Sequence, residues 1–412
     1  MSRYVFCFPY RGIGGVSILF ARLAERLALL PDHEVYVVDY PDGDLNKNVR
    51  NPRIGRIVYE DEGTVPIPED ATLVVQSRPD WFFPGPLSIP DSTRLFFWTC
   101  YPFNLVPTIP GLRKLTAGVP PVGRAVLATV LRGYRARIVS FIRFLETCHA
   151  LAFMDEPNVQ NTSYYLDMNL REPIYLPIFA GEPRSSKPTY KFDSELRVSW
   201  VGRIADFKYP ILKYAASALD RVVPDLKISI RLTVVGQGEY LPALRADATK
   251  WKNLTVQFIN EIAPTALPTF LQDDTDVLMA MGTSALEGAS NGVPTILLDP
   301  SFADVPDGYV FSWLHERSGY SLGKILSAND FVPGNNSLRN LLQDATDNIE
   351  AISGRALSYY KANHAPGMVQ ERFLQHSSAS SCYYRQYREH GFGKPEPLYA
   401  AYSAIRRGFL GS

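Results

Sequence analysis

The sequence has few residues of the kinds that bind metals or form disulfides. Only four of its 412 residues are cysteine, and they are widely separated, with no Cys-x-x-Cys pair. This spacing indicates neither a zinc knuckle nor a disulfide framework, and it favours a reduced, cytosolic chain. A convincing Asp-x-Asp loop is also lacking, because Asp273 and Asp274 precede an expected strand and are interpreted as surface residues.

The sequence also lacks an excess of charge and a long apolar run. It has 42 basic and 42 acidic residues, which argues against a general nucleic-acid binder that relies on neutralising phosphates. No run of about 18 uncharged apolar residues is present, so no transmembrane helix is expected. The first residues form a strand-length apolar run without the pattern of a secretory signal.

The chain length and the order of apolar runs predict two α/β domains. A chain of 412 residues exceeds what one hydrophobic core usually organises. A strand-like run at 3–10 is followed by a glycine turn, a helical apolar pattern at 16–30 and a second strand-like run at 33–40. This order is typical of a parallel sheet with a crossover helix. Further strands of the first half are expected at 71–77, 93–99, 148–155 and 173–179.

A segment rich in proline, serine and charge, residues 180–193, is interpreted as a linker. The alternation of strands and helices restarts after it, with strands expected at 196–204, 227–238, 254–259, 276–281 and 293–299. The predicted division is a Rossmann-like domain at 1–180, a linker at 181–193, a second Rossmann-like domain at 194–370, and a helical tail at 371–412 that crosses back to the first domain.

The stretch at 276–299 places a short helix between two apolar runs. A helix N-terminus offers unpaired N–H groups and the positive end of a dipole, so Gly282, Thr283 and Ser284 are candidates to bind a diphosphate. Glu287, one turn further on, would face the same ligand and could accept hydrogen bonds from a ribose. The alternative is that Ser284 caps the helix and Glu287 completes a capping box.

Two basic residues follow the first strand of the second half. Arg203 comes after the expected strand end and Lys208 lies in the loop before a helix, so both could reach phosphate oxygens at the carboxyl edge of a sheet. The alternative is an ordinary solvated pair of cations.

Glycines follow a strand in each half. Gly12, Gly14 and Gly15 permit tight backbone and close ligand approach, although their spacing is not that of a dinucleotide fingerprint. Gly236 and Gly238 follow a strand in the second half in the same way. The alternative in both places is that the glycines only allow close packing and do not contact a ligand.

Taken in order, these motifs resemble the retaining glycosyltransferases of family 4, which have the GT-B fold. The resemblance implies two Rossmann-like domains facing each other across a cleft, and a nucleotide-diphosphate sugar as donor. It implies that Arg203 and Lys208 bind the donor diphosphate as the catalytic residues, that Glu287 binds the donor ribose, and that Gly14 and Gly15 approach the diphosphate. No cofactor or metal is expected. The implied acceptor is a glycan or lipid-linked saccharide, as in bacterial surface polysaccharide synthesis.

The sequence departs from the family pattern at two places. The first glutamate of the family's Glu-x7-Glu element falls at Met279, and the histidine common near a strand end of the first domain is missing. Tyr101 and Asn104 lie where that histidine is expected and are candidates for the sugar cleft, as is Asp155. Two alternatives remain: a sugar-nucleotide epimerase of similar fold, with His149 and Asp155 as acid and base, and a non-catalytic relative that binds a partner.

Residues 122–145 combine arginines with an apolar stripe at helical spacing. A basic amphipathic helix of this type can lie on an anionic membrane surface. The sequence therefore predicts a cytoplasmic protein that attaches peripherally to the inner face of the membrane. The alternative is an ordinary helix whose apolar stripe faces the core.

Overall fold

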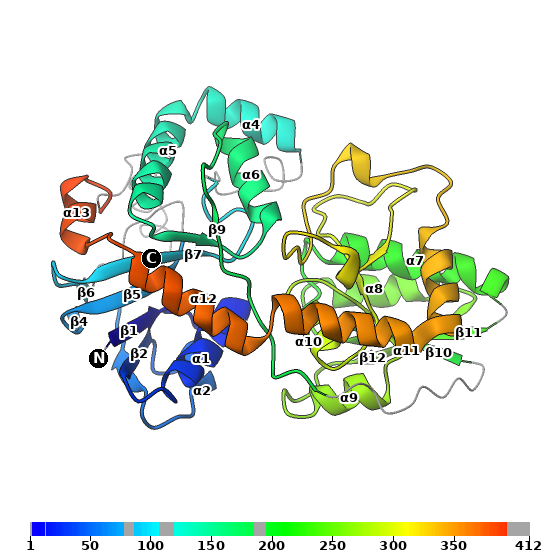
Figure 1. Ribbon diagram of the computed structural model, residues 1–412. Coiled ribbons are helices and arrows are strands. Elements are labelled where there is room, and N and C mark those ends of the chain that lie inside the picture. Colours follow the sequence, from blue (N-terminus) through cyan, green and yellow to red (C-terminus); the bar gives the residue numbers. More distant parts are fainter. Residues whose placement is uncertain are drawn as a thin grey trace, which may run out of the picture. The chain divides into compact units, whose positions relative to one another are not determined.

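The computed structural model describes residues 2–12, 14–77, 86–106, 119–184, 195–226 and 228–393. The chain divides into two compact units (Figure 1). The first comprises Met1–Met154, Asn158–Ile178 and Val369–Ser412, and the second comprises Asp155–Pro157 and Phe179–Met368. The sequence-based division had placed its boundaries after residues 180 and 370. Most of the expected linker, and the aromatic residues at 81–83, lie outside the described residues.

The first unit is built on a seven-stranded sheet in the order β3-β2-β1-β5-β7-β8-β9, and all its neighbouring strands are parallel. The chain moves outward from β1 first in one direction and then in the other, as it does in Rossmann folds. The strands are β1 Ser2–Cys7, β2 His33–Asp39, β3 Gly55–Val58, β5 Ala71–Gln76, β7 Arg94–Thr99, β8 Leu151–Phe153 and β9 Ile174–Tyr175. A separate short pair joins β4 Val65–Pro66 to β6 Leu87–Ser88.

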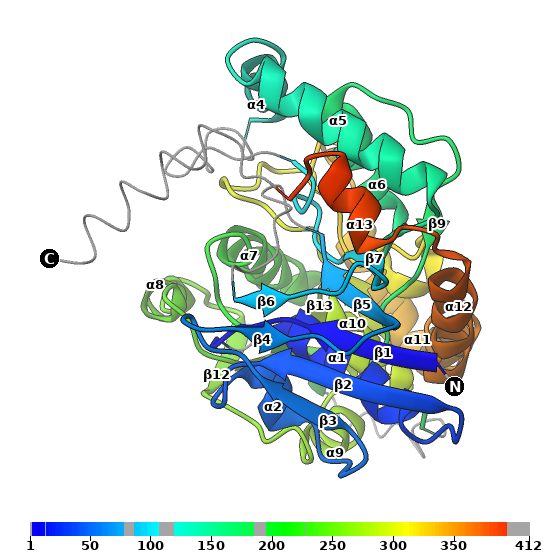
Figure 2. The ribbon, with the colours of Figure 1, turned by 90° about the vertical axis from the view of Figure 1, so that its left-hand side faces the viewer.

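Helices cover both faces of this sheet, as Figure 2 shows. Successive strand residues point to opposite faces, so Phe96 packs on Phe373 of α12 (Pro366–Ala379), whereas Phe97 packs on Phe141 of α5 (Arg132–Thr147). The first face also carries α1 (Gly15–Leu27), and the second carries α13 (Tyr384–Glu389). The central strands β5 and β7 are therefore buried on both sides, which explains why they are mostly apolar runs.

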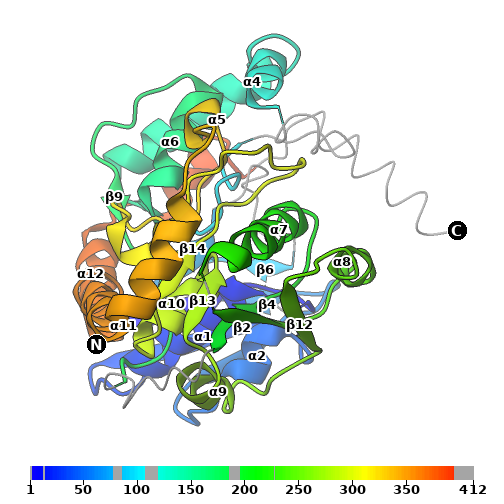
Figure 3. The same cartoon turned by 90° about the vertical axis from the view of Figure 1, so that its right-hand side faces the viewer.

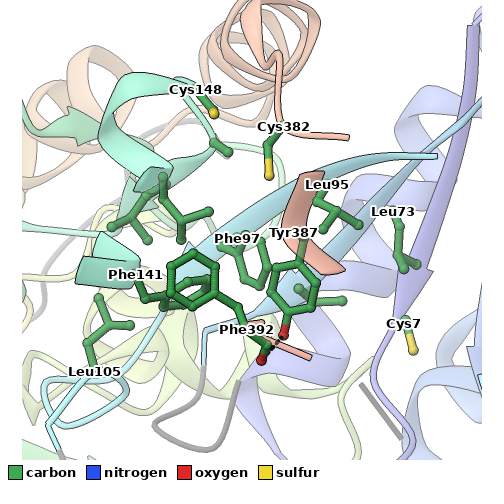
Figure 4. Packing of buried hydrophobic residues seen from close by; sticks show 14 of the residues in the cluster. Cys7, Leu73, Leu95, Phe97, Leu105, Phe141, Cys148, Cys382, Tyr387 and Phe392 are labelled. Carbon is green, nitrogen blue, oxygen red and sulfur yellow. Dashed lines mark hydrogen bonds between the residues drawn. The ribbon is translucent and has the colours of Figure 1, made fainter. Parts of the chain in front are cut away.

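The C-terminal part of the chain returns to the first unit. The amide of Leu95 donates to the carbonyl of Cys382 at 2.8 Å, and Arg94 forms an isolated bridge with Tyr383. Tyr387 then packs against Phe97 within the buried cluster drawn in Figure 4. This segment is thus an integral part of the first core.

The second unit has a six-stranded sheet in the order β12-β11-β10-β13-β14-β15, parallel except for the last edge strand. The strands are β10 Glu195–Val201, β11 Ser229–Val235, β12 Leu254–Ile259, β13 Val277–Ala280, β14 Thr295–Leu297 and β15 Ser312–Trp313. This order again moves outward in both directions from its first strand, so both units have the Rossmann-like topology that the sequence predicts.

Helices α7 and α10 pack on the second sheet (Figure 3). Helix α7 (Tyr209–Leu226) buries Ile211 and Leu219 against the side that carries Val198 and Trp200. Helix α10 (Thr283–Ser290) packs so closely that a Cβ on Gly288 would lie 2.5 Å from a Leu278 side-chain carbon. The unit also contains α8 Leu241–Ala248, α9 Leu267–Asp273, the 3-10 helices η1 Leu314–Glu316 and η2 Ala328–Asp330, and the long α11 Ser337–Asn363.

The prediction of one amphipathic helix at 122–145 is wrong. The segment forms two helices, α4 (Pro120–Ala128) and α5, with a break at Thr129–Leu131. Ile138, Phe141 and Leu145 are fully buried in the first core. The apolar stripe of α5 therefore packs against the sheet, which agrees with the alternative of an ordinary helix whose apolar stripe faces the core.

Candidate functional site

The candidate residues of the second unit gather where its chain order reverses. Strands β10 and β13 are neighbours in the sheet, but β10 leads to β11 on one side and β13 leads to β14 on the other. In open α/β sheets, ligands bind at the carboxyl ends of two such strands. Arg203 and Lys208 follow β10, and Gly282 to Ser284 follow β13.

Helix α10 begins at this edge with unoccupied N–H groups. Gly282 is the residue before the helix, with φ of 61°, and it has no side chain with which to cap the first turn. The capping-box alternative is therefore wrong, because Ser284 lies inside the helix and Glu287 is its fifth residue. The amides of Thr283 and Ser284 have no acceptor within the helix, since the first turn lacks preceding carbonyls. They lie at the positive end of the helix dipole.

Lys208 and Ser284 approach the same small space above Gly202. Gly202 has φ of 151°, and a Cβ on it would lie 3.3 Å from Lys208 Nζ and 3.7 Å from Ser284 Oγ. The glycine keeps this position empty. A cationic side chain from the β10 loop is thereby brought beside the N-terminus of α10, as an anion-binding site requires.

Aromatic rings lie close to the ammonium group of Lys208. Its Nζ lies 5.9 Å from the ring centre of Trp200 and 5.8 Å from that of Phe207. Burial, and then the charge of Arg203, lower the pKa of Lys208 to about 8. Within the described ranges no carboxylate pairs with Lys208 or Arg203. Two cations without a counter-ion favour the arrival of an anion.

Arg203 and Glu287 differ in their exposure. Arg203 is exposed, and the Glu287 side chain is half-buried on α10. Glu287 comes four residues after Thr283 and therefore lies on the same helical face. Ribose binding by Glu287 stays a prediction.

Gly236 and Gly238 serve backbone packing. Their φ values are 145° and 152°, and Cβ atoms on them would collide with the carbonyl oxygens of Gly202 and Ile204. The Ile204 amide in turn donates to the Gln237 carbonyl at 2.8 Å. These glycines thus let the loop after β11 support the loop that carries Arg203 and Lys208.

A buried carboxylate that the sequence analysis did not single out supports the other side of the site. Asp299 is 1% exposed and accepts hydrogen bonds from Tyr309 Oη at 2.8 Å and Arg317 Nη2 at 3.0 Å. Its other oxygen accepts the Lys324 amide at 2.9 Å. Burial raises the pKa of Tyr309, so its hydroxyl remains a donor.

The Asp299 interactions fix a backbone segment against α10. The segment preceding Lys324 contains Leu322, whose carbonyl accepts the Gly282 amide at 2.8 Å. A Cβ on Gly323 would also contact the Leu298 carbonyl at 3.1 Å. Asp299 therefore positions the turn before α10 without reaching the open space itself. The sequence places Asp299 at the end of an expected strand. It could not indicate the partners of Asp299, because they come from a loop that has no apolar periodicity.

In the first unit, carboxylates organise the glycine turn. Asp44 accepts the Gly14 amide at 3.2 Å and the Ser17 hydroxyl at 2.6 Å. Asp39 is fully buried and accepts the amide of Tyr10 at 2.9 Å. The Gly14 amide thus has an internal acceptor, whereas Gly15 is exposed at the start of α1. Diphosphate binding at Gly14 and Gly15 stays a prediction.

The sugar-cleft candidates of the first half differ in their surroundings. Asn104 is buried, and its Oδ1 accepts the Cys100 amide at 3.0 Å and Gln76 Nε2 at 3.2 Å. Tyr101 is half-buried, with its ring 5.8 Å from that of Phe103. Asp155 is fully buried. Asn104 therefore already has a structural role in the turn after β7.

His149 and Asp155 do not form an acid and base pair on one strand end. His149 precedes β8, whereas Asp155 follows it. They lie at opposite ends of the strand, so the epimerase alternative loses the pair on which it depended.

Met279 stands at the position where the Glu-x7-Glu element would have its first glutamate. It is 1% exposed within β13 and pairs with Trp200 and Ile296 on the neighbouring strands. A carboxylate at this position would be buried in the sheet. The turn between β13 and α10 is only two residues long, which leaves no loop to carry a second acidic group.

Two features are absent from the described part of the chain. It contains no group of three or more His, Cys, Asp or Glu side chains placed to hold a metal ion. None of its helices combines the length and apolar character needed to cross a bilayer.

Comparison with solved structures identifies the architecture. HepE from Anabaena, solved with UDP and glucose, aligns over 92% of this chain and 100% of its own, with a TM-score of 0.53 and 10% identity. WaaG, a glycosyltransferase involved in lipopolysaccharide biosynthesis, aligns over 89% and 98%, with a TM-score of 0.51 and 16% identity. An E. coli trehalose-6-phosphate structure bound with UDP-2-fluoro glucose aligns over 91% and 99%, with a TM-score of 0.54 and 11% identity.

The fold is that of the GT-B glycosyltransferases. Each GT-B chain has two Rossmann-like domains, which agrees with the two sheets described above. No protein-family description matches this sequence, and no curated protein matches it significantly.

Proposed function

We propose that this protein is a glycosyltransferase that uses a nucleotide-diphosphate sugar as donor. The observation that carries the proposal is the Lys208 ammonium. It lies beside the open N-terminus of α10, has a lowered pKa, and has no carboxylate partner among the residues described. Similar folds solved with UDP or a UDP-sugar support the choice of ligand.

In this proposal the second unit stabilises the leaving group. As the bond from the sugar to the diphosphate breaks, negative charge grows on the departing phosphate oxygens. Arg203, Lys208 and the amides of Thr283 and Ser284 would lie around that charge, and preorganised donors of this type contribute strongly to catalysis. Glu287 would hold the ribose and fix the position of the diphosphate.

The finer features of the reaction belong to the same proposal. We propose transfer to a glycan or lipid-linked saccharide with retention of configuration, and without a required metal, because two cations and a helix N-terminus can neutralise the diphosphate. Product analysis by NMR before and after chelator treatment tests both points. An inverted anomeric linkage, or activity lost on chelation and restored by Mg²⁺, would contradict them.

Binding of nucleoside diphosphates tests the core of the proposal. Titration calorimetry with UDP, GDP, dTDP and ADP should give one clear binder for the wild-type protein. Lys208→Met should weaken that binding about 10- to 100-fold, since a charge-assisted hydrogen bond contributes about 1.5–3 kcal/mol. Lys213→Met is the matched control, because Lys213 lies on α7 and pairs with Asp304. Equal effects of the two substitutions, or no binder at all, would favour a non-catalytic protein.

Membrane attachment is proposed in a narrower form than the sequence suggested. Around α4, Val122 and Val130 are exposed, the latter by 73%, and Arg124 and Arg132 are exposed beside them. We propose that this short basic and apolar surface contacts anionic lipid. In a flotation assay with vesicles that contain phosphatidylglycerol, Val130→Asp should reduce the fraction of protein that floats with the vesicles. The control Val332→Asp, at an exposed valine of the second unit, should not change flotation.

A further inference from the structure

Two cysteines that are 234 positions apart in the sequence meet in the core of the first unit. Cys148 follows α5, and Cys382 belongs to the returning C-terminal segment. The Ser381 amide donates to the Cys148 carbonyl at 2.9 Å, which fixes the two backbones side by side. Both cysteines are reduced and belong to one buried cluster, where Figure 4 shows them beside each other.

We propose that Cys148 and Cys382 form a peroxide-oxidisable thiol pair whose disulfide fastens the C-terminal segment to the first unit. The two thiols are hydrogen-bonded to each other, and a disulfide bond of about 2.05 Å would draw their sulfur atoms closer. Such a pair is independent of the nucleotide site, which lies in the other unit.

The surroundings give the two thiols different roles. Cys148 is 9% exposed, whereas Cys382 has no exposed surface. Hydrogen bonds from the Cys382 thiol, and from the hydroxyls of Thr147 and Ser381, lower the pKa of Cys148, and the thiolate is the reactive form. Cys148 is therefore the residue that meets the oxidant, and Cys382 is the residue that completes the disulfide.

The proposed reaction has two steps. The Cys148 thiolate attacks one oxygen of hydrogen peroxide, the O–O bond breaks, and the sulfur becomes a sulfenic acid while the other oxygen leaves as water after taking a proton. The Cys382 sulfur then attacks Cys148 Sγ, loses its proton, and releases a second water. In total the two thiols lose two electrons and two protons, and hydrogen peroxide is reduced to two waters.

The disulfide would secure a segment that is part of the core. Beyond Cys382, Tyr387 packs 6.1 Å from Phe141, and Phe392 packs 5.1 Å from the same ring. Loss of this segment would uncover those rings. A covalent bond at its start prevents the whole segment from separating from the sheet.

Peptide mapping of the full-length protein tests the pair. After treatment with hydrogen peroxide, alkylation and trypsin digestion without reductant, peptides 144–171 and 373–385 should appear linked. Cys100→Ser, the control at a half-buried cysteine of the same unit, should give the same linked peptides. Cys382→Ser should instead leave a sulfenic acid at Cys148, detected with dimedone.

The wild-type map alone decides the question if a variant fails to fold. Recovery of both peptides in alkylated form after peroxide treatment would overturn the proposal, as would a linkage to Cys7 or Cys100. Oxidation should also raise the melting temperature by several degrees and reduce proteolysis after residue 382, and dithiothreitol should reverse both effects. Unchanged melting and proteolysis of the linked protein would refute the fastening role.

Discussion

Affinity for the nucleoside diphosphate should fall as the pH rises through about 8. The cause is Lys208, whose pKa is lowered to about 8 by burial and by the charge of Arg203. Only the protonated amine offers a positive charge to the diphosphate, and the bound anion holds that proton more tightly. The loss of affinity therefore follows deprotonation of the free protein.

The size of this effect follows from the titration. With a pKa of about 8, roughly nine-tenths of the lysines carry the proton at about pH 7, and roughly one-tenth carry it at about pH 9. If the protonated form alone binds, the dissociation constant rises about tenfold over that interval. The phosphates of the ligand are largely ionised at both values, because the second pKa of a terminal phosphate is about 6, so they contribute little to the change.

Folding should respond to pH with the opposite sign. The pKa of Lys208 is lower in the folded chain than the ordinary value of 10.5. Between about pH 8 and 10.5 the unfolded chain thus binds more protons, and this residue alone makes the folded state more stable as the pH rises. Weaker binding at high pH is therefore separable from alkaline unfolding.

Calorimetric titration of wild type, Lys208→Arg and Lys213→Met at about pH 7 and about pH 9 measures the effect. The arginine variant keeps its charge at both values and should show less than a twofold change. The Lys213→Met control should behave as wild type, with the tenfold change. A pH-independent dissociation constant for wild type, or a tenfold change that persists in Lys208→Arg, would refute the assignment.

Three further predictions follow from the packing around the site. Asp299→Asn should lower the free energy of unfolding by about 2 kcal/mol, measured by chemical denaturation, because it weakens buried charge-assisted hydrogen bonds. It should also weaken nucleotide binding, measured by calorimetry, and an unchanged nucleotide affinity would show that Asp299 does not position the site. Glu287→Ala should weaken binding of a nucleoside diphosphate more than that of inorganic diphosphate, and equal losses would contradict the ribose assignment. Gly288→Ala should destabilise the protein by about 1–3 kcal/mol through overpacking. The control Gly354→Ala, at an open position on α11, should stabilise it by about 0.5–1 kcal/mol. Thermal melts in which Gly288→Ala is the more stable variant would contradict the packing of α10.

The sequence was informative wherever local chemistry determines structure. Strand β13 and most of β1 are buried on both faces and therefore appear as continuous apolar runs. The short helix α10 could be placed because small residues separate two such runs. From those elements and the order of the strands, the two Rossmann-like units and the loop positions of Arg203 and Lys208 were predictable.

The sequence was uninformative where residues distant along the chain meet. Cys148 and Cys382 carry no local signal, because their proximity depends on how the C-terminal segment packs. Asp299 gains its role from an irregular loop. The apolar stripe of α5 has the same spacing whether it faces a membrane or a core, so periodicity alone could not decide between them.

The most direct test of the central claim is a crystal structure with the nucleoside diphosphate that binds best. We expect its phosphate oxygens to accept hydrogen bonds from the amides of Thr283 and Ser284 and from Lys208 Nζ, with the ribose beside Glu287. A nucleotide bound away from the β10 and β13 strand ends, with the N-terminus of α10 left open, would contradict it.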